Sequence, residues 1–387
     1  MSAGSAAVIA KARAKYGGLL GLDEYKTLIS KANVGEIVAQ LKTYGDFCED
    51  FSAVDNTVRR SQAERLMEKR LFRIYDELRK FCPGSKNKFY DFLLIQEEIK
   101  QIINAAMYIG AGVYDLFIPG FPGYLTNICS YDIRALSKAR TFDEILDVLK
   151  GTPYYDVLAP LSDGTKAFPP IVSVDYELTK YLYTTLFSRI KKDMSGSERT
   201  EVEKCIRRRC DMYNIKICYR LKGLFKMSTE DVVAHTLPFC DRFDKKTMEQ
   251  ILTKADNEPI LPLLLKLPYF KDINEEQATD IETAVYTSNK RYYDAKLALS
   301  QCDSTVIYSL TELLQIENRN LTTVIEGVRY SLEPSQIEKN ADIIEQIYSE
   351  RNDIMAVEKM SLISVSGPLK KSQQNSCTML RNEMFSH

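Results

Sequence analysis

Few residues of this chain have the types and spacing that catalysis or metal binding requires. Histidine occurs only at His235 and at the terminal His387, so a histidine-based triad or a zinc site has almost no bases or ligands to draw on. The nine cysteines contain no C-x-x-C pair, and their odd number favours a reducing compartment over a disulfide framework. We therefore expect no metal site and interpret the thiols as buried or incidental.

Phosphate-binding and acid–base motifs are also missing. The segment 162–166 fails the P-loop pattern because a threonine separates Gly164 from Lys166 and the upstream glycine is missing. Two pairs of carboxylates lie among other charges and are interpreted as solvated helix faces: Glu97/Glu98 and Glu275/Glu276. The sequence thus predicts a protein with no catalytic residues and no cofactor, whereas an enzyme would need a pocket with convergent titratable groups.

Binding features are stronger, and the clearest is a basic segment. It runs from residue 204 to residue 226 and contains Lys204, Arg207, Arg208, Arg209, Lys216, Arg220, Lys222 and Lys226. Two interpretations stay open: a solvated face balanced by acidic residues elsewhere, or a contact with an acidic protein surface or anionic lipid headgroups. Nucleic acid is disfavoured as a partner because the whole chain has a net charge of −1.

The elements that position these residues repeat three times along the chain. A tripeptide recurs at steps of 107 and 116 residues, as Ser30-Lys31-Ala32, Ser137-Lys138-Ala139 and Thr253-Lys254-Ala255. An aromatic turn follows each copy, and then a long helical segment with a paired marker at steps of 111 and 110 residues: Leu71-Phe72, Leu182-Tyr183 and Tyr292-Tyr293. Because the markers keep their order and spacing, we expect a true three-fold repeat.

Each copy is expected to be helical. Asn33 and Glu36, like Thr141 and Glu144, have the spacing of a capping box and predict helix starts. The last long helix of the third copy places apolar residues on one face: Val306, Leu310, Leu313, Leu314, Leu321, Val324, Ile325 and Val328. The sequence thus predicts an all-α protein with three homologous helical domains, 1–118, 119–234 and 235–350, and a flexible extension at 351–387. Packed about a pseudo-three-fold axis, three such domains would leave a central opening.

Membrane association is expected to be peripheral. The start of the chain has no charged residue before its first apolar stretch, which is not the pattern of a secretory signal. The most apolar segment, 105–125, contains Asp115, Pro119, Pro122 and four glycines. It therefore cannot form the single helix of about 20 residues that spans a bilayer.

Taken together, these residues resemble the C-subunit family of bacterial and archaeal V/A-type (vacuolar-type) ATPases, whose eukaryotic counterpart is the d-subunit of vacuolar ATPases. The resemblance spans roughly residues 7–345, and its best carriers are residues 12–25, Asn214–Arg220 with Leu237-Pro238, and Glu317–Leu321 with Arg329-Tyr330. It implies a funnel of three similar helical domains that sits on the cytoplasmic face of the membrane rotor ring and receives the tip of the central shaft. The chain would then be a non-catalytic rotary coupler in proton or sodium transport, cytoplasmic and peripheral to the membrane.

The resemblance also implies two sets of contact residues. Candidate contacts with the shaft or rotor are Arg207, Arg208, Arg209, Asn214, Arg220, Asn320 and Arg329. The last four residues of this list hold matching places in the repeated domains. There they would line the opening or hydrogen-bond between helices, although the first domain has Glu98 at the place of Asn214. A candidate ring-facing loop contains Phe117, Phe121 and Tyr124, with a buried linker as the alternative. The rival interpretation of the whole chain is an unrelated cytosolic helical adaptor.

Overall fold

The chain is all-α, as the sequence predicted. A computed structural model describes residues 3–341, except 56, 83–86, 113–122, 163, 165–167, 272 and 274–279, and this part contains helices and no strand. The predicted extension at 351–387 and two of the candidate ring-facing residues, Phe117 and Phe121, lie outside the described residues.

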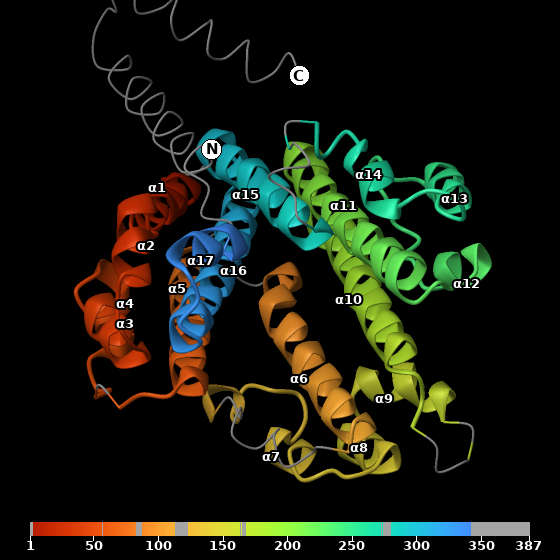
Figure 1. Cartoon of the computed structure of the whole chain (residues 1–387), viewed down its shortest axis with the longest axis horizontal. Helices are drawn as coiled ribbons and strands as arrows, with labels where there is room; N and C mark the ends of the chain where they lie inside the picture. The colour runs from red at the N-terminus through yellow and green to blue at the C-terminus, as the bar shows by residue number, and fades with distance from the viewer. Residues whose placement is uncertain are drawn as a thin grey trace, which may run out of the picture.

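Short helices followed by two long helices occur three times in chain order (Figure 1). After α1 (Ala3–Gly17), the first set is α2 (Leu22–Ile29), α3 (Val34–Leu41), α4 (Gly45–Phe51), α5 (Arg60–Phe81), η1 (Lys88–Asp91) and α6 (Phe92–Gly110). The second is η4 (Gly123–Leu125), α7 (Ile133–Leu136), α8 (Phe142–Leu149), α9 (Pro153–Leu158), η5 (Ala159–Leu161), α10 (Ile171–Asp193), α11 (Gly196–Cys218) and the π-helix η6 (Tyr219–Leu224). The third is α12 (Thr229–Ala234), α13 (Lys245–Lys254), α14 (Ile260–Leu265), α15 (Ile281–Leu299) and α16 (Asp303–Arg329), and α17 (Pro334–Asn340) follows. The three-domain boundaries and the pseudo-three-fold axis stay predictions.

Two of the short helices begin where the sequence predicted. The Asn33 side chain accepts a hydrogen bond from the Glu36 backbone N–H at 3.0 Å, and Thr141 accepts from Glu144 at 3.2 Å. Each bond satisfies one of the backbone donors that a helix leaves unpaired in its first turn. These local bonds explain why α3 and α8 start at fixed points.

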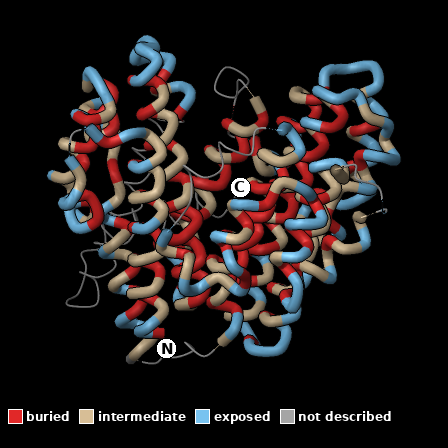
Figure 2. The backbone as a smooth tube through the Cα atoms, turned by 90° about the horizontal axis from the view of Figure 1, so that it is seen from below, coloured by how far each residue is buried: buried red, intermediate tan, exposed pale blue. Residues whose placement is uncertain are grey.

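The longest helix, α16, is the centre of the packing. It lies against α1, α5, α11 and α15, and every member of its predicted apolar face is buried. The largest apolar cluster of the described residues extends from Val8 to Leu314 and therefore draws on all three predicted domains. Two smaller clusters cover the ends of the long helices: α2 to α4 pack on the end of α16, and α12 to α14 pack on the end of α11. Figure 2 shows buried backbone concentrated inside and exposed backbone on the outer lobes.

The apolar segment 105–125 does not continue as one helix. α6 ends at Gly110, and Gly112 has a φ of +69°, a left-handed conformation that glycine adopts without strain. Within the described residues, no helix combines the length and apolarity that crossing a membrane requires.

Candidate functional site

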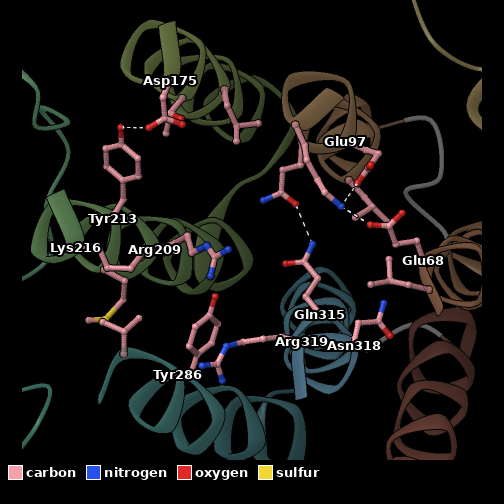
Figure 3. Close-up of a pocket in the computed structure, with 18 of the residues that line it drawn as sticks. Glu68, Glu97, Asp175, Arg209, Tyr213, Lys216, Tyr286, Gln315, Asn318 and Arg319 are labelled. Atoms are coloured by element: carbon pink, nitrogen blue, oxygen red, sulfur yellow. Dashed lines mark hydrogen bonds and ion pairs between the residues drawn. The ribbon is translucent and has the colours of Figure 1, made fainter. Parts of the chain in front are cut away.

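A cavity of about 710 Å³ lies among the long helices of the described chain (Figure 3). The six longest helices, α5, α6, α10, α11, α15 and α16, all contribute side chains to it, together with η6. Gln96 of α6 accepts a hydrogen bond from Gln315 of α16 at 3.4 Å across one side of this space. We call this space the central cavity.

The α5 and α6 wall of the central cavity is acidic. It contains Glu64, Glu68 and Glu97, with Lys100 between the last two. The Lys100 Nζ lies 3.6 Å from Glu97 and also forms an ion pair with Glu68. Burial raises the pKa of Glu97, whereas for Lys100 the attraction of the two carboxylates outweighs burial and raises the pKa. The ion pairs therefore hold Lys100 charged within an acidic wall.

The wall formed by α11, η6 and α16 is basic. Arg209, Lys216, Arg220 and Arg319 line the cavity there, and Figure 3 shows Arg209 and Arg319 reaching toward it from two helices. Their counter-charges lie on neighbouring helices: Arg209 is 2.9 Å from Glu312, and Arg220 is 2.5 Å from a second carboxylate, Glu282. The two walls of the central cavity thus differ in sign, which suits recognition of a partner that carries both charges.

The third wall is formed by α10 and is nearly neutral. Asp175 accepts a hydrogen bond from the Tyr213 hydroxyl of α11 at 2.9 Å. Burial raises the pKa of Asp175, and this effect outweighs the hydrogen bond and the nearby cations. Within the described residues, no group of three or more histidine, cysteine, aspartate or glutamate side chains is placed to hold a metal ion.

The three consecutive arginines of the basic segment have three different environments. Arg207 lies 5.0 Å above the Phe187 ring and donates to the Cys240 carbonyl at 3.3 Å. Arg208 is buried between two tyrosines of the third set of helices, and only Arg209 lines the central cavity. Side chains at successive positions of a helix point about 100° apart, so the run cannot form one contact face. Most of the segment's other charges are also paired within the protein, as Lys222 is with Asp256 at 2.6 Å.

Of the four residues at matching places, one lines the central cavity. That residue is Arg220, whose side chain is 52% exposed. Asn214 is buried, and its amide both donates to and accepts from the backbone of Leu237, at 3.1 and 2.7 Å, so it bonds α11 to the connection between α12 and α13. Asn320 is buried as well and accepts from Arg319 at 3.4 Å, while Arg329 is exposed and stacks on Tyr330.

Tyr124 is the only candidate ring-facing residue that the described part of the chain contains. It is half-buried, and its ring centroid lies 5.3 Å from that of Phe72 on α5. Phe72 in turn lines the central cavity. Tyr124 therefore packs the end of the connection after α6 against a cavity helix, and the contact of this loop with a ring stays a prediction.

The interpretation of Glu97 and Glu98 as a solvated helix face was wrong. Glu97 is 7% exposed and Glu98 is 4% exposed. Glu98 accepts from the Tyr154 hydroxyl at 2.6 Å and from the Ser130 backbone N–H, so it ties α6 to the second set of short helices. The other pair, Glu275/Glu276, lies outside the described residues. The signal that was missed is the i,i+3 pair of Glu97 and Lys100 on an otherwise apolar helix, which favours a shielded polar site over open solvent.

Comparison with known proteins finds relatives along most of the chain. The chain is 23% identical over 343 residues to the C-subunit of the A-type ATP synthase of Thermococcus onnurineus, covering 85% of this chain and 88% of the relative. It is also 23% identical to the proteins of the same name from Desulfurococcus sp., over 86% of this chain and 89% of the relative, and from Methanosarcina acetivorans, over 73% and 77%. The sequence model of the ATP synthase (C/AC39) subunit family matches residues 8–340. With nearly the whole described chain inside that match, this protein belongs to the ATP synthase (C/AC39) subunit family.

Proposed function

We propose that this protein is the non-catalytic rotor-coupling component of a V/A-type rotary ATPase. In this role it joins the central shaft of the ATPase to the membrane rotor ring, so that rotation passes between ATP turnover and the transport of protons or sodium ions. Membership of the ATP synthase (C/AC39) subunit family and the names of its relatives support a place in such a complex. The cytoplasmic face of the membrane is the corresponding location.

The observation that carries the proposal is the central cavity. Its walls come from six long helices of three parts of the chain, so one partner seated in this socket would contact all three parts. Packed helices resist bending because interiors have crystal-like density and low compressibility. A torque applied inside the socket would therefore reach the outer lobes with little loss to deformation.

Buried ion pairs stiffen this socket. Arg70 of α5 and Glu317 of α16 pair at 2.6 Å and are 1% and 4% exposed. Glu317 also accepts from the Leu20 backbone N–H at 2.8 Å, which fixes the start of the first set of short helices. One carboxylate thus joins three segments that are far apart in the sequence.

The chemistry of the socket defines the occupant that we propose. The shaft tip should offer basic groups to the α5 and α6 wall and acidic groups to the α11, η6 and α16 wall. A stable and specific interface needs to bury at least about 1,200 Å² in total, so the tip must also contact the rim. The connection that ends at Tyr124 stays our candidate for the side that meets the ring.

A pull-down from gently solubilised membranes tests this function. The tagged chain should bring down both the shaft and the ring, and Arg220→Glu should weaken capture of the shaft by roughly tenfold because it reverses one charge of the socket wall. Lys245→Glu, on the exposed start of α13, is the matched control and should have no effect.

Deletion of the chain gives a second test. Hydrolysis of ATP by the detached head should persist, while coupled ion transport should stop. Retained ion pumping without this chain would refute the coupling role. If the chain fractionates with the supernatant and captures neither shaft nor ring, a role as a cytosolic helical adaptor becomes the better interpretation of this family member.

A further inference from the structure

A second cavity, of about 220 Å³, lies between α11 and the third set of helices. Its lining comes from α11, α15, the segment between α12 and α13, and the turn after α14. Four cationic side chains and one carboxylate line it: Lys204, Arg208, Arg242, Arg291 and Asp241. One water occupies about 30 Å³ in the liquid, so the space suits a small ion of several atoms. We call it the cationic cavity.

Arg208 is the buried member of this lining. Its side chain is 7% exposed, and its Nη2 donates to the Ser288 hydroxyl at 2.6 Å and to the Ser288 carbonyl at 3.1 Å. The guanidinium lies 4.8 Å from the ring of Tyr269 and 4.4 Å from the ring of Tyr292. Its Nε has no acceptor in the described protein, and Arg208 forms no ion pair with any carboxylate there.

Other buried cations of the described chain have carboxylate partners. Arg70 pairs with Glu317 at 2.6 Å, and Lys290 pairs with Asp294 at the same distance. This contrast matters because burying an ion without a partner costs more free energy than contacts with tyrosine rings return. Arg208 cannot avoid the cost by losing its proton: burial lowers its pKa, but a guanidinium remains charged near neutral pH.

The carboxylates that the described chain places beside this cavity are already engaged. The Asp211 Oδ2 accepts from the backbone N–H groups of residues 241 and 242 at 3.0 and 2.8 Å and also from the Tyr269 hydroxyl. Asp241 faces Arg242, with 3.9 Å between its Oδ2 and the arginine Nε. With Arg291 left out of the sum, Lys204, Arg208 and Arg242 still outnumber the one lining carboxylate, so positive charge predominates around the buried guanidinium.

We propose that the cationic cavity binds a phosphate-type oxyanion, with Arg208 as its buried anchor and Lys204 and Arg242 at its rim. A planar guanidinium presents parallel donors that match the oxygens of such an anion, and the rim charges would attract it from solvent. Lys204 is exposed, and the Arg242 side chain is 57% exposed, so both are accessible. The bound anion would connect α11 to α15 and to the segment before α13, and would hold the third set of short helices against the long ones.

Titration of the full-length chain with inorganic phosphate tests the proposal. Calorimetry should show saturable binding of phosphate but not of chloride at equal ionic strength. Arg208→Gln and Arg242→Gln should each weaken phosphate binding by about tenfold or more, because each removes a charge-assisted hydrogen bond. Arg207→Gln is the matched control: Arg207 precedes Arg208 on α11 but packs on Phe187 outside the cavity, so phosphate affinity should not change.

Two outcomes would overturn the proposal: no saturable phosphate binding by the unmodified chain, or equal affinity in the chain and in the Arg242→Gln variant. Because the Arg242 side chain is exposed, the Arg242→Gln variant should fold and can decide the test even if Arg208→Gln does not fold. Vesicles of phosphatidylcholine with and without a phosphoinositide distinguish the source of the phosphate group. If phosphoinositide vesicles capture the chain and free phosphate reverses this capture, the ligand is a lipid headgroup. If the chain binds phosphate but the vesicles do not capture it, the ligand is the free ion.

Discussion

Replacement of Glu317 by glutamine tests how much the buried ion pair between α5 and α16 stabilises the socket. Arg70 and Glu317 are 1% and 4% exposed and 2.6 Å apart, so glutamine leaves a buried guanidinium without its counter-charge. Breaking a buried pair in this way costs about 3–5 kcal/mol. Glutamine keeps an oxygen that can accept from Leu20, whereas Glu317→Ala also removes this buried hydrogen bond and should cost about 1–3 kcal/mol more.

Urea unfolding, followed by the helical circular dichroism signal, measures these differences. With a slope of about 3 kcal/mol per molar urea, a loss of about 3 kcal/mol moves the midpoint by about 1 M. Glu326→Gln is the matched control, since Glu326 also lies on α16 and pairs with Arg60 but both side chains are more than one-third exposed. Exposed pairs contribute only about 0–1 kcal/mol, so this variant should unfold almost like the unmodified protein.

The double variant Arg70→Met/Glu317→Gln separates the charge from the packing. It leaves no unpaired ion and keeps an acceptor for the Leu20 backbone N–H, so it should recover most of the stability that Glu317→Gln loses. Equal midpoints for Glu317→Gln and Glu326→Gln would refute the reasoning. A double variant no more stable than Glu317→Gln would show that shape, not charge, decides the effect.

Three further predictions concern stability. Gly327→Ala should destabilise the protein by about 1–3 kcal/mol in urea, because the new Cβ would lie 2.5 Å from Ile337 on α17, whereas Gly17→Ala, with nothing within 4 Å, should not. Asn214→Ala should lose about 1–3 kcal/mol because it leaves the buried Leu237 backbone N–H and carbonyl unpaired, and an Asn214→Ala variant as stable as the unmodified chain would count against that anchoring role. Burial raises the pKa of Cys205 from 9.0 to about 11, so unfolding releases its proton and stability should fall as the pH rises from about 9 to about 11. Cys205→Ala should reduce this pH dependence of the urea midpoint without abolishing it, because burial also raises the pKa of Cys82 to about 11, and an unchanged slope would exclude the Cys205 thiol as one of its sources.

Local features of this protein were predictable because they depend on residues a few positions apart. The capping pair of Asn33 and Glu36 predicted the start of α3, and the break of the 105–125 segment followed from its glycines and prolines. The apolar period of α16 predicted the face that is buried in the structure. Each of these inferences needs only the geometry of one helix turn.

The predicted repeat aligns Asn214 with Glu98, but the partners of these side chains were not predictable. Both side chains anchor the connection that follows their helix. The partner is a backbone group of Leu237 in one case and includes the Tyr154 hydroxyl in the other. The two side chains therefore share a role, which is to anchor the connection after their helix, but the groups that they bond to differ.

The candidate sites show why charge in the sequence was a weaker guide than periodicity. Helical amphipathicity assigns polar residues to solvent, but the long helices of this fold also face an internal cavity. Glu97 is buried there for that reason, and Arg209 finds Glu312 as its partner. The adjacent Arg208 turns toward the cationic cavity instead.

The sequence by itself determined that the described chain is helical, where two of the short helices begin, and that short and long helices alternate in a repeating order. Only the tertiary structure decided which six helices enclose the central cavity and which charges have a counter-ion. The physical reason is the range of the forces. A helix is specified by hydrogen bonds and side-chain spacing within four residues, whereas the pair of Arg70 and Glu317 joins residues 247 positions apart and exists only once the chain has packed.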